Sequence, residues 1–223
     1  FHVVAPDTSG NNDRLITSSD LDGVLDLINQ GLQGQAICPT DPAGSGSNFQ
    51  LCLAQRTIFN EPSSGIYYWQ NQEVADVDPC TENMALKNIA RQESDPFPST
   101  DYLNIWVVDE ICPSCYGSCA LSAYATFPAA HGSAQDGIVI EARQLLPGQC
   151  DKLKIFMHEI GHYLNLYHTF DGGCKNDDCL IDGDKVCDTP PDNDDNFYPD
   201  HPCLIGQELN SCNTDVNSAD PNN

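Results

Sequence analysis

Basic residues are scarce in this sequence. Nine lysines and arginines stand against 33 aspartates and glutamates, so the 223-residue chain carries a formal net charge of −24. Such a charge repels nucleic acid and anionic membranes, and it attracts cations, including metal ions and basic polypeptides. The scarcity of basic residues therefore excludes nucleic-acid partners. The negative charge can be explained by solubility as well as by a role in substrate selection.

Long hydrophobic runs are also missing. No apolar stretch approaches the roughly 18 residues that a membrane-spanning helix needs, so we expect no membrane span. Hydrophobic residues still make up 40% of the chain, which is enough for the core of one domain or of two small lobes around a cleft. The chain opens at Phe1 with a strand-like Phe-His-Val-Val, so we expect that an upstream targeting segment has been removed.

Cysteine, in contrast, is abundant, with twelve residues in the chain. This number favours secretion into an oxidising compartment and several disulfides. The alternative is structural zinc bound by thiolates, because the spacings Cys112-x2-Cys115-x3-Cys119 and Cys174-x4-Cys179 suit a metal. No equally tight second pair follows at zinc-ribbon spacing, which favours disulfides, and the spacing leaves their connectivity open.

Hydrophobic periodicity predicts helices and strands as far as residue 164. Ser18 and Ser19 offer N-caps for an amphipathic helix, and 151–164 is the clearest helix of the chain. A short helix is expected over 81–92, and strands over 1–5, 49–56, 103–108, 123–127 and 137–142. Beyond Asn165 the chain is loop-like and rich in aspartate. The pattern predicts an α+β or α/β domain with a second lobe built from loops.

His158, Glu159 and His162 form the most informative stretch. Histidines at positions i and i+4 lie one above the other on one helix face, so both imidazoles can reach one ion. Glu159 can be aimed at the open coordination position of the metal, where it can hold a water molecule and take its proton. Zinc in a catalytic site needs three protein ligands and one exchangeable position.

The third ligand is offered by His168, which cannot lie on the same helix face. It stands six residues past His162, so the chain must turn sharply after Leu164. That turn needs a residue that tolerates the left-handed backbone conformation, for which Gly is best and Asn is next. Asn165 stands where the turn should be. The sequence therefore predicts a zinc ion bound by three histidines, with Glu159 as the general base.

The stretch 158–168 resembles the zinc signature HExxHxxGxxH of the metzincin metallopeptidases, with Asn165 in place of the usual Gly. The wider sequence is similar to the pappalysin group within them, including its cytophagalysin-like and ulilysin-like members. The shared stretches run through most of the chain: Phe1-His2-Val3-Val4, Tyr102-Leu103-Asn104-Ile105-Trp106, Tyr124-Ala125-Thr126-Phe127-Pro128, Asp136-Gly137-Ile138-Val139-Ile140, His168-Thr169-Phe170 and Gly183-Asp184-x-Val186-x-Asp188-Thr189-Pro190.

The resemblance implies an α+β fold. Its N-terminal lobe, residues 1–165, would be of α/β type, with a twisted, mostly parallel sheet, an antiparallel rim strand, a backing helix and an active-site helix. An irregular, disulfide-rich C-terminal lobe would follow over residues 166–223, and both lobes would form one catalytic domain. The rim strand, where a substrate would add as an antiparallel strand, is expected to contain Gly137, Ile138, Val139 and Ile140.

The resemblance also implies a function. The chain would be a secreted, extracellular zinc endopeptidase that hydrolyses peptide bonds in proteins and favours basic residues near the scissile bond. Some relatives carry structural calcium in the loops after the third histidine, which points to Asp184, Asp188 and Thr189 as calcium ligands. Calcium takes about six to eight oxygen ligands, but no EF-hand spacing is present, so the alternative is a solvated acidic loop.

The Met-containing turn of the metzincins has no counterpart here, because the two methionines, Met84 and Met157, both precede the third histidine. We expect this turn and its following Tyr on polypeptide outside this sequence, and the alternative is a domain without that support. Two rival functions stay open: a non-catalytic binding module that keeps the metal, and a calcium-dependent adhesion domain. Three other histidines are not expected to be ligands: His2 in a core strand, and His131 and His201 in loops.

Overall fold

The structure is a computed structural model that describes residues 1–5, 16–39, 41, 44–71, 73–89, 95–112, 121–174, 178, 180–187, 189 and 212. The chain divides into two compact units, Phe1–Leu164 and Asn165–Asn223. Every helix and strand within the described ranges lies in the first unit. None of these helices is long and apolar enough to cross a membrane.

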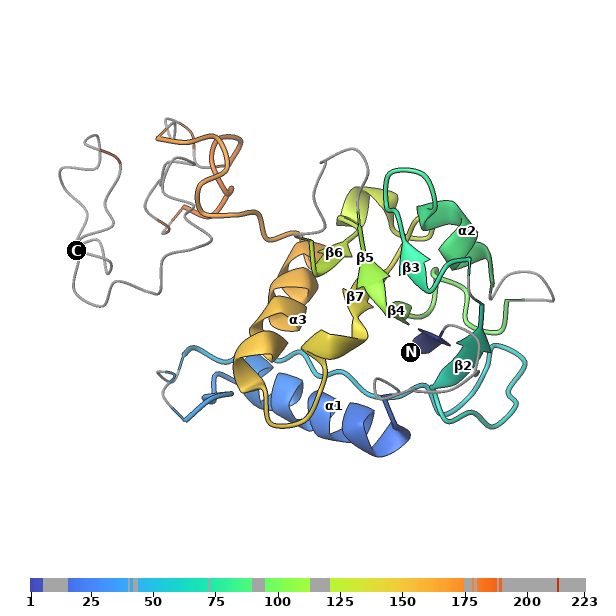
Figure 1. Ribbon diagram of the computed structural model, residues 1–223. Coiled ribbons are helices and arrows are strands. Elements are labelled where there is room, and N and C mark those ends of the chain that lie inside the picture. Colours follow the sequence, from blue (N-terminus) through green and yellow to red (C-terminus); the bar gives the residue numbers. More distant parts are fainter. Residues whose placement is uncertain are drawn as a thin grey trace. The chain divides into compact units, whose positions relative to one another are not determined.

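A five-stranded sheet organises the first unit (Figure 1). Its strands follow the order β2-β1-β4-β7-β6, where β1 is His2–Ala5, β2 is Tyr67–Gln70, β4 is Ile105–Val108, β6 is Ala123–Ala125 and β7 is Ile138–Glu141. All neighbours pair in parallel except β6, which runs antiparallel to β7 at one edge. The expected mostly parallel sheet with one antiparallel strand is confirmed. Two short strands, β3 (Asp76–Val77) and β5 (Glu110–Ile111), form a separate parallel pair.

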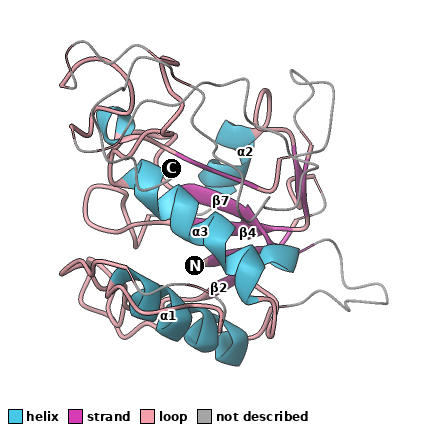
Figure 2. Ribbon diagram, turned by 90° about the vertical axis from the view of Figure 1, so that its left-hand side faces the viewer, coloured by secondary structure: helices cyan, strands magenta, loops and turns pink. Residues whose placement is uncertain are grey.

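Helices lie on both faces of the sheet (Figures 1 and 2). On one face, α1 (Ser18–Leu32) and α3 (Cys150–Tyr163) share a core with Ile138 and Ile140 of β7. On the other face, α2 (Asn83–Asn88), β3 and β5 share a second core with Val139. Successive residues of β7 thus point into two different cores, as expected of a strand buried on both faces. Two 3-10 turns, η3 (Pro128–Ala130) and η4 (Ala142–Gln144), flank β7 in sequence.

The start of α1 differs by one residue from the prediction. Thr17, rather than Ser18 or Ser19, is the N-cap: its hydroxyl accepts the Asp20 N–H at 3.2 Å, and the Asp20 carboxylate accepts the Thr17 N–H at 2.9 Å. This reciprocal pair is a capping box in which Asp takes the place of the usual Glu or Gln. The apolar face of the helix is confirmed, with Leu21 and its neighbours buried.

The strand predicted over 49–56 is wrong. The segment makes one isolated bridge, between Arg56 and Pro62, and Phe49 is 58% exposed. At Leu51 a side chain satisfies the backbone instead: the Asn29 amide donates to the Leu51 carbonyl and accepts the Leu51 N–H, both at 2.8 Å. The sequence pattern also missed β2, β3 and β5. The helix expected over 81–92 is shorter, and part of its predicted range lies outside the described residues.

Disulfides, rather than zinc-thiolate sites, account for all of the described cysteines except Cys52. Cys38 bonds to Cys150, the first residue of α3, and Cys174 bonds to Cys212 in the second unit. Three more cysteines, Cys80, Cys112 and Cys187, are also disulfide-bonded, and Cys52 is free and exposed. The expected compact loop over 112–119 lies mostly outside the described residues.

His2 of β1 is a buried core residue, as expected. Its ring lies 4.1 Å from the Trp106 ring, its Nδ1 accepts the Trp69 indole N–H at 3.3 Å, and its Nε2 lies 2.9 Å from the Asn104 amide oxygen. One nitrogen accepting and the other donating is the pattern of a neutral imidazole. Burial lowers the pKa of His2 from 6.5 to about 4.

We therefore predict that acidification destabilises the first unit through His2. The folded state binds this proton less readily than the unfolded state, so the stability is complete above about pH 6.5 and is lost as the pH falls towards 4. The full difference corresponds to about 3 kcal/mol. Urea unfolding at a series of pH values measures it. The His2→Gln variant should lose this part of the pH dependence, and an unchanged slope in that variant would contradict the assignment.

Candidate metal centre

Helix α3 presents His158 and His162 one turn apart near its C-terminal end. Their ring centroids are 4.4 Å apart. Leu153, Phe156 and Ile160 are buried in the core on the sheet side of the helix. The apolar stripe thus fixes the rotation of α3, and that rotation decides where the two imidazoles point.

The chain leaves the helix as the sequence predicts. Leu164 is the C-cap, and its N–H still donates to the Ile160 carbonyl at 3.0 Å. Asn165 then adopts a φ of +78°, in the left-handed region. Asn accepts this conformation at a lower cost than most residues other than Gly, because its short polar side chain can bond locally. The predicted turn residue is therefore confirmed.

Ring nitrogens of His158, His162 and His168 lie within 4.8 Å of one another. Three nitrogens bound to zinc at about 2.1 Å in a tetrahedral arrangement are about 3.4 Å apart, so a small inward movement of the side chains would suffice. Imidazole nitrogens suit zinc and other transition metals better than calcium or magnesium. The three histidines therefore fit a zinc ion both by chemistry and by spacing.

A second group of donor atoms, Cys38, Cys150 and Asp151, also lies close together. Its two sulfurs are joined in a disulfide, so they are not available as thiolate ligands. Among the described residues, the histidine group is the better candidate for a metal.

Glu159 lies next to the first histidine and is only 6% exposed. Burial raises the pKa of its carboxyl group to about 7. A cation bound by the neighbouring histidines would oppose this shift, because positive charge favours the carboxylate. Glu159 is therefore placed as a group that can both take and return a proton near neutral pH.

Aromatic and acidic neighbours support the imidazoles. The Phe127 ring lies 5.1 Å from the His162 ring, between centroids. In the second unit, the His168 N–H donates to the Asp171 carboxylate at 3.1 Å, and His168 Nδ1 lies 3.8 Å from the other oxygen of that carboxylate. A carboxylate behind a ligating histidine orients its ring. Asp171 was not among the residues predicted from the sequence, although its i+3 spacing from His168 was a usable signal.

The expected rim strand is corrected by the sheet topology. Gly137, Ile138, Val139 and Ile140 do not form an edge, because β7 pairs with β4 on one side and with β6 on the other. The edge strand is β6, with Ala123, Tyr124 and Ala125. The composition carried this signal: an unbroken β-branched run is typical of an inner strand, whereas Ala-Tyr-Ala is much less apolar.

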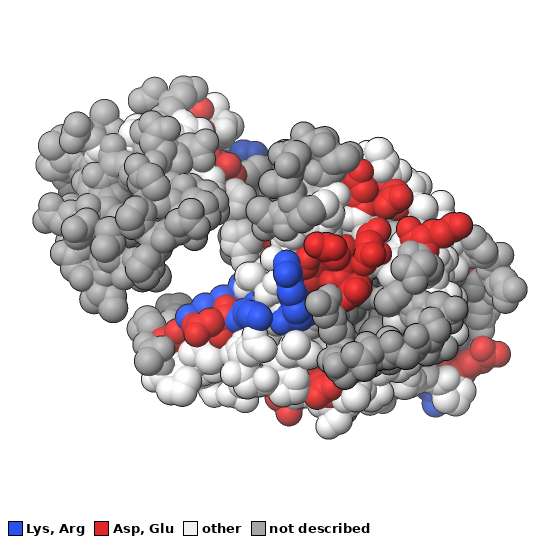
Figure 3. All heavy atoms as spheres, in the orientation of Figure 1, with Lys and Arg blue, Asp and Glu red and all other residues white. Residues whose placement is uncertain are grey.

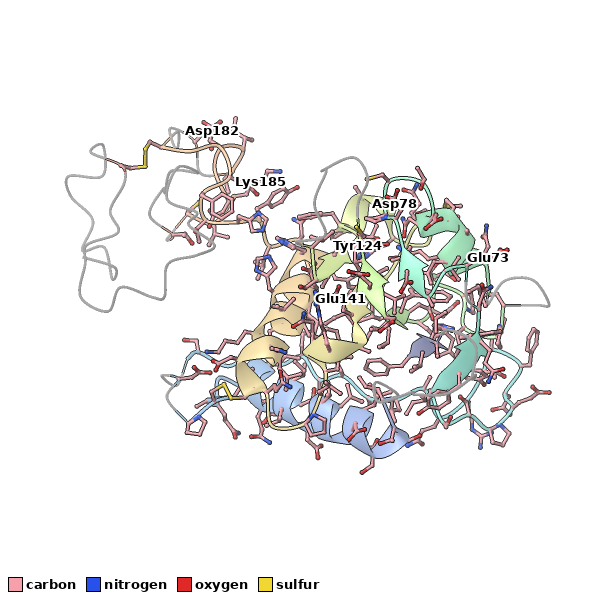
Figure 4. All side chains as sticks on the ribbon, viewed as in Figure 1. Glu73, Asp78, Tyr124, Glu141, Asp182 and Lys185 are labelled. Carbon is pink, nitrogen blue, oxygen red and sulfur yellow. A yellow bond between two sulfur atoms is a disulfide. The ribbon has the colours of Figure 1, made fainter. Side chains whose placement is uncertain are left out.

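Side chains of α2 contact Tyr124 of strand β6. The Tyr124 hydroxyl donates to the Asn83 side chain at 3.0 Å, and Lys87 lies with its ammonium 5.7 Å from the Tyr124 ring centroid. Burial raises the pKa of the Tyr124 hydroxyl, and the charge of Asp78 adds to the effect; Figure 4 labels both residues. Acidic side chains gather on the face of the first unit that carries β3 and β5 (Figure 3). Glu110 of β5 is exposed, and so is Glu73, which precedes β3 in the sequence.

The predicted calcium ligands are only partly described. Asp184 is buried, and its carboxylate accepts the Val186 N–H at 2.9 Å. Thr189 donates its N–H to the Val186 carbonyl at 3.2 Å, and Asp188 lies outside the described residues. Calcium binding in this loop therefore stays a prediction.

A family model described as pregnancy-associated plasma protein-A matches residues 83–221. An extracellular metalloprotease of Arthroderma benhamiae is 26% identical over 196 residues, which cover 85% of this chain and 53% of that protein. The extracellular metalloprotease of Arthroderma otae is 32% identical over 198 residues, which cover 86% of this chain and 57% of that protein. The chain thus spans a little more than half the length of these relatives.

Solved structures share the fold. Mature mirolysin of Tannerella forsythia, in complex with a cleaved peptide, superposes with a TM-score of 0.62 at 22% identity, covering 86% of this chain and 70% of that chain. Mirolysin in complex with compound 9 gives the same TM-score at 21% identity, covering 93% of this chain and 78% of that chain. The likeness confirms the α+β architecture derived above. With a family model that matches most of the chain, including all three histidines and Glu159, the chain belongs to the pappalysin family of metallopeptidases.

Proposed function

We propose that this chain is the catalytic part of a secreted zinc endopeptidase. The observation that carries the proposal is the approach of three histidine ring nitrogens to within 4.8 Å, with the buried Glu159 on the same helix. His158, His162 and His168 would hold the metal. When bound, zinc would supply a Lewis acid that polarises the scissile carbonyl and makes water acidic enough to attack it near neutral pH.

Glu159 would act as the general base and then as the general acid. Its carboxylate would take a proton from the attacking water and deliver it to the leaving amine. Burial favours the neutral form of the carboxyl group, which helps the second step, whereas the positive charge of a bound metal favours the ionised form that the first step needs. The same side chain can therefore serve both steps without a second acid.

The substrate would bind as an extended strand along the free edge of β6. This edge has no partner strand within the described part of the sheet. Phe127, which follows β6, has its ring against the ring of the ligand His162, so the edge lies near the metal site. Addition of a strand to an exposed sheet edge supplies main-chain hydrogen bonds that any peptide can make. The main chain would then provide affinity, and side-chain contacts would provide the choice of sequence.

The proposal extends to secretion, to substrate preference and to a structural ion. The extracellular relatives and the disulfides support secretion. The net charge of −24 supports a preference for basic residues near the scissile bond, and calcium in the loop 184–189 would neutralise some of that charge. A non-catalytic binding module with the same fold is the alternative, but such a module would have no use for a buried carboxylate beside the metal ligands.

Replacing the general base separates catalysis from metal binding. We expect Glu159→Gln to keep about one zinc per chain and to lower kcat on a casein substrate by about 10²- to 10⁴-fold, because proton transfer is lost while the ligands remain. Zinc content by atomic absorption and cleavage by gel assay measure the two effects. Glu110→Gln removes an exposed carboxylate elsewhere and should change neither. Wild-type turnover in Glu159→Gln would refute the assigned role.

Removing the third ligand should affect the metal first. We expect His168→Ala to lower the zinc content well below one per chain and to abolish cleavage, because two imidazoles alone leave the ion weakly held. The matched variant Thr169→Ala changes an exposed neighbour and should behave as the wild type. Zinc retained by His168→Ala at the wild-type affinity, in a titration with a competing chelator, would show that another residue is the ligand.

A further inference from the structure

We infer that His131 is a specificity-determining residue, which contacts a substrate side chain on the N-terminal side of the scissile bond and favours an aromatic residue there. The inference rests on the proposed peptidase function and on substrate pairing with β6. It concerns a residue outside the metal centre, expected from the sequence to be an ordinary loop residue.

The position of His131 follows from the chain that leaves β6. Phe127, in an extended conformation, begins the 3-10 turn η3, and His131 ends it. The Phe127 ring contacts the ligand His162, and the His131 ring stacks on the next residue of α3, Tyr163, with centroids 4.0 Å apart and planes 25° apart. These two contacts place the segment 127–131 along the C-terminal end of the helix that carries the ligands.

The direction of β6 decides which part of a substrate meets this segment. A substrate strand antiparallel to β6 places its earlier residues beside the C-terminal end of β6. Phe127 lies against the ligand His162, so the substrate residues beside Phe127 are near the metal. Substrate residues that lie further along, towards His131, come earlier in the substrate sequence. His131 therefore lies on the side of the substrate that is N-terminal to the scissile bond.

The loop that carries His131 is held in place before any substrate arrives. The Gly132 N–H donates to the Asp136 carboxylate at 2.6 Å, and Asp136 is 2% exposed. The Thr126 hydroxyl donates to the Gln135 carbonyl at 2.7 Å, and the buried Lys87 ammonium donates to the same carbonyl. A binding group that is already ordered loses little conformational entropy when the ligand binds.

The chemistry of the exposed ring indicates the preferred partner. His131 is exposed although one face of its imidazole lies on Tyr163, so part of the ring is open to a substrate. A flat ring on a fixed aromatic support favours another aromatic side chain, because aromatic pairs are stabilised beyond the burial of area alone. The nearby Asp136 is 2% exposed and its carboxylate accepts the Gly132 N–H, so a basic substrate side chain could not contact that carboxylate directly.

The test uses the zinc-loaded, intact protein and peptides that carry Phe or Ala at each of the three positions before the scissile bond. We expect the wild type to favour Phe at one of these positions and His131→Ala to lower that preference about three- to tenfold in kcat/KM, with the Ala peptide cleaved as before. Ala129→Ser, an exposed substitution in the same turn, should keep the preference.

Binding provides a second readout that does not depend on turnover. In the Glu159→Gln background, the Phe peptide should bind more tightly than the Ala peptide by fluorescence anisotropy, and adding His131→Ala should remove the difference. Cleavage by the wild type without a Phe preference, or with a preference that His131→Ala leaves intact, overturns this inference and leaves the peptidase proposal standing. A zinc-loaded wild type that cleaves no peptide overturns both.

Discussion

A reversal of the backbone at one residue is the constraint on which the metal centre depends. Helix α3 can present two imidazoles on one face, but a third ligand on the same helix would point away from them. The left-handed conformation of Asn165 ends the helix within one residue of its C-cap and turns the chain before it reaches His168. The path of the chain towards His168 therefore depends on this turn. Few residues other than Gly and Asn can make it.

The sheet supports this centre because α3 packs against it in a fixed orientation. Its inner strands β1, β4 and β7 are buried on both faces, and α3 packs its apolar stripe against β7 and β6. Because β6 is both the edge of the sheet and a neighbour of α3, the same packing that orients the histidines also sets the edge beside them. One buried surface thus positions both the chemistry and the proposed substrate strand.

Local patterns in the sequence predicted the helices, the inner strands and the three histidines, because each depends on residues close together in the chain. The i, i+4 histidine pair and the turn at Asn165 are of this kind. The order of the strands is not: the prediction placed the rim at Gly137–Ile140, whereas pairing with β4 and β6 makes that segment internal. The prediction of a strand at 49–56 failed because the amide of Asn29, a distant residue, satisfies the Leu51 backbone.

The Cys38–Cys150 disulfide determines how the first unit would respond to a proteolytic cut. The bond joins residues 112 positions apart, and exposed segments such as 58–62 lie between them. A cut in such a segment would divide the polypeptide but would leave α3 covalently attached to the piece that carries β1 and α1. The helix that carries His158 and His162 would then stay covalently attached to its core after an internal cut, and reduction would be needed to separate the two fragments.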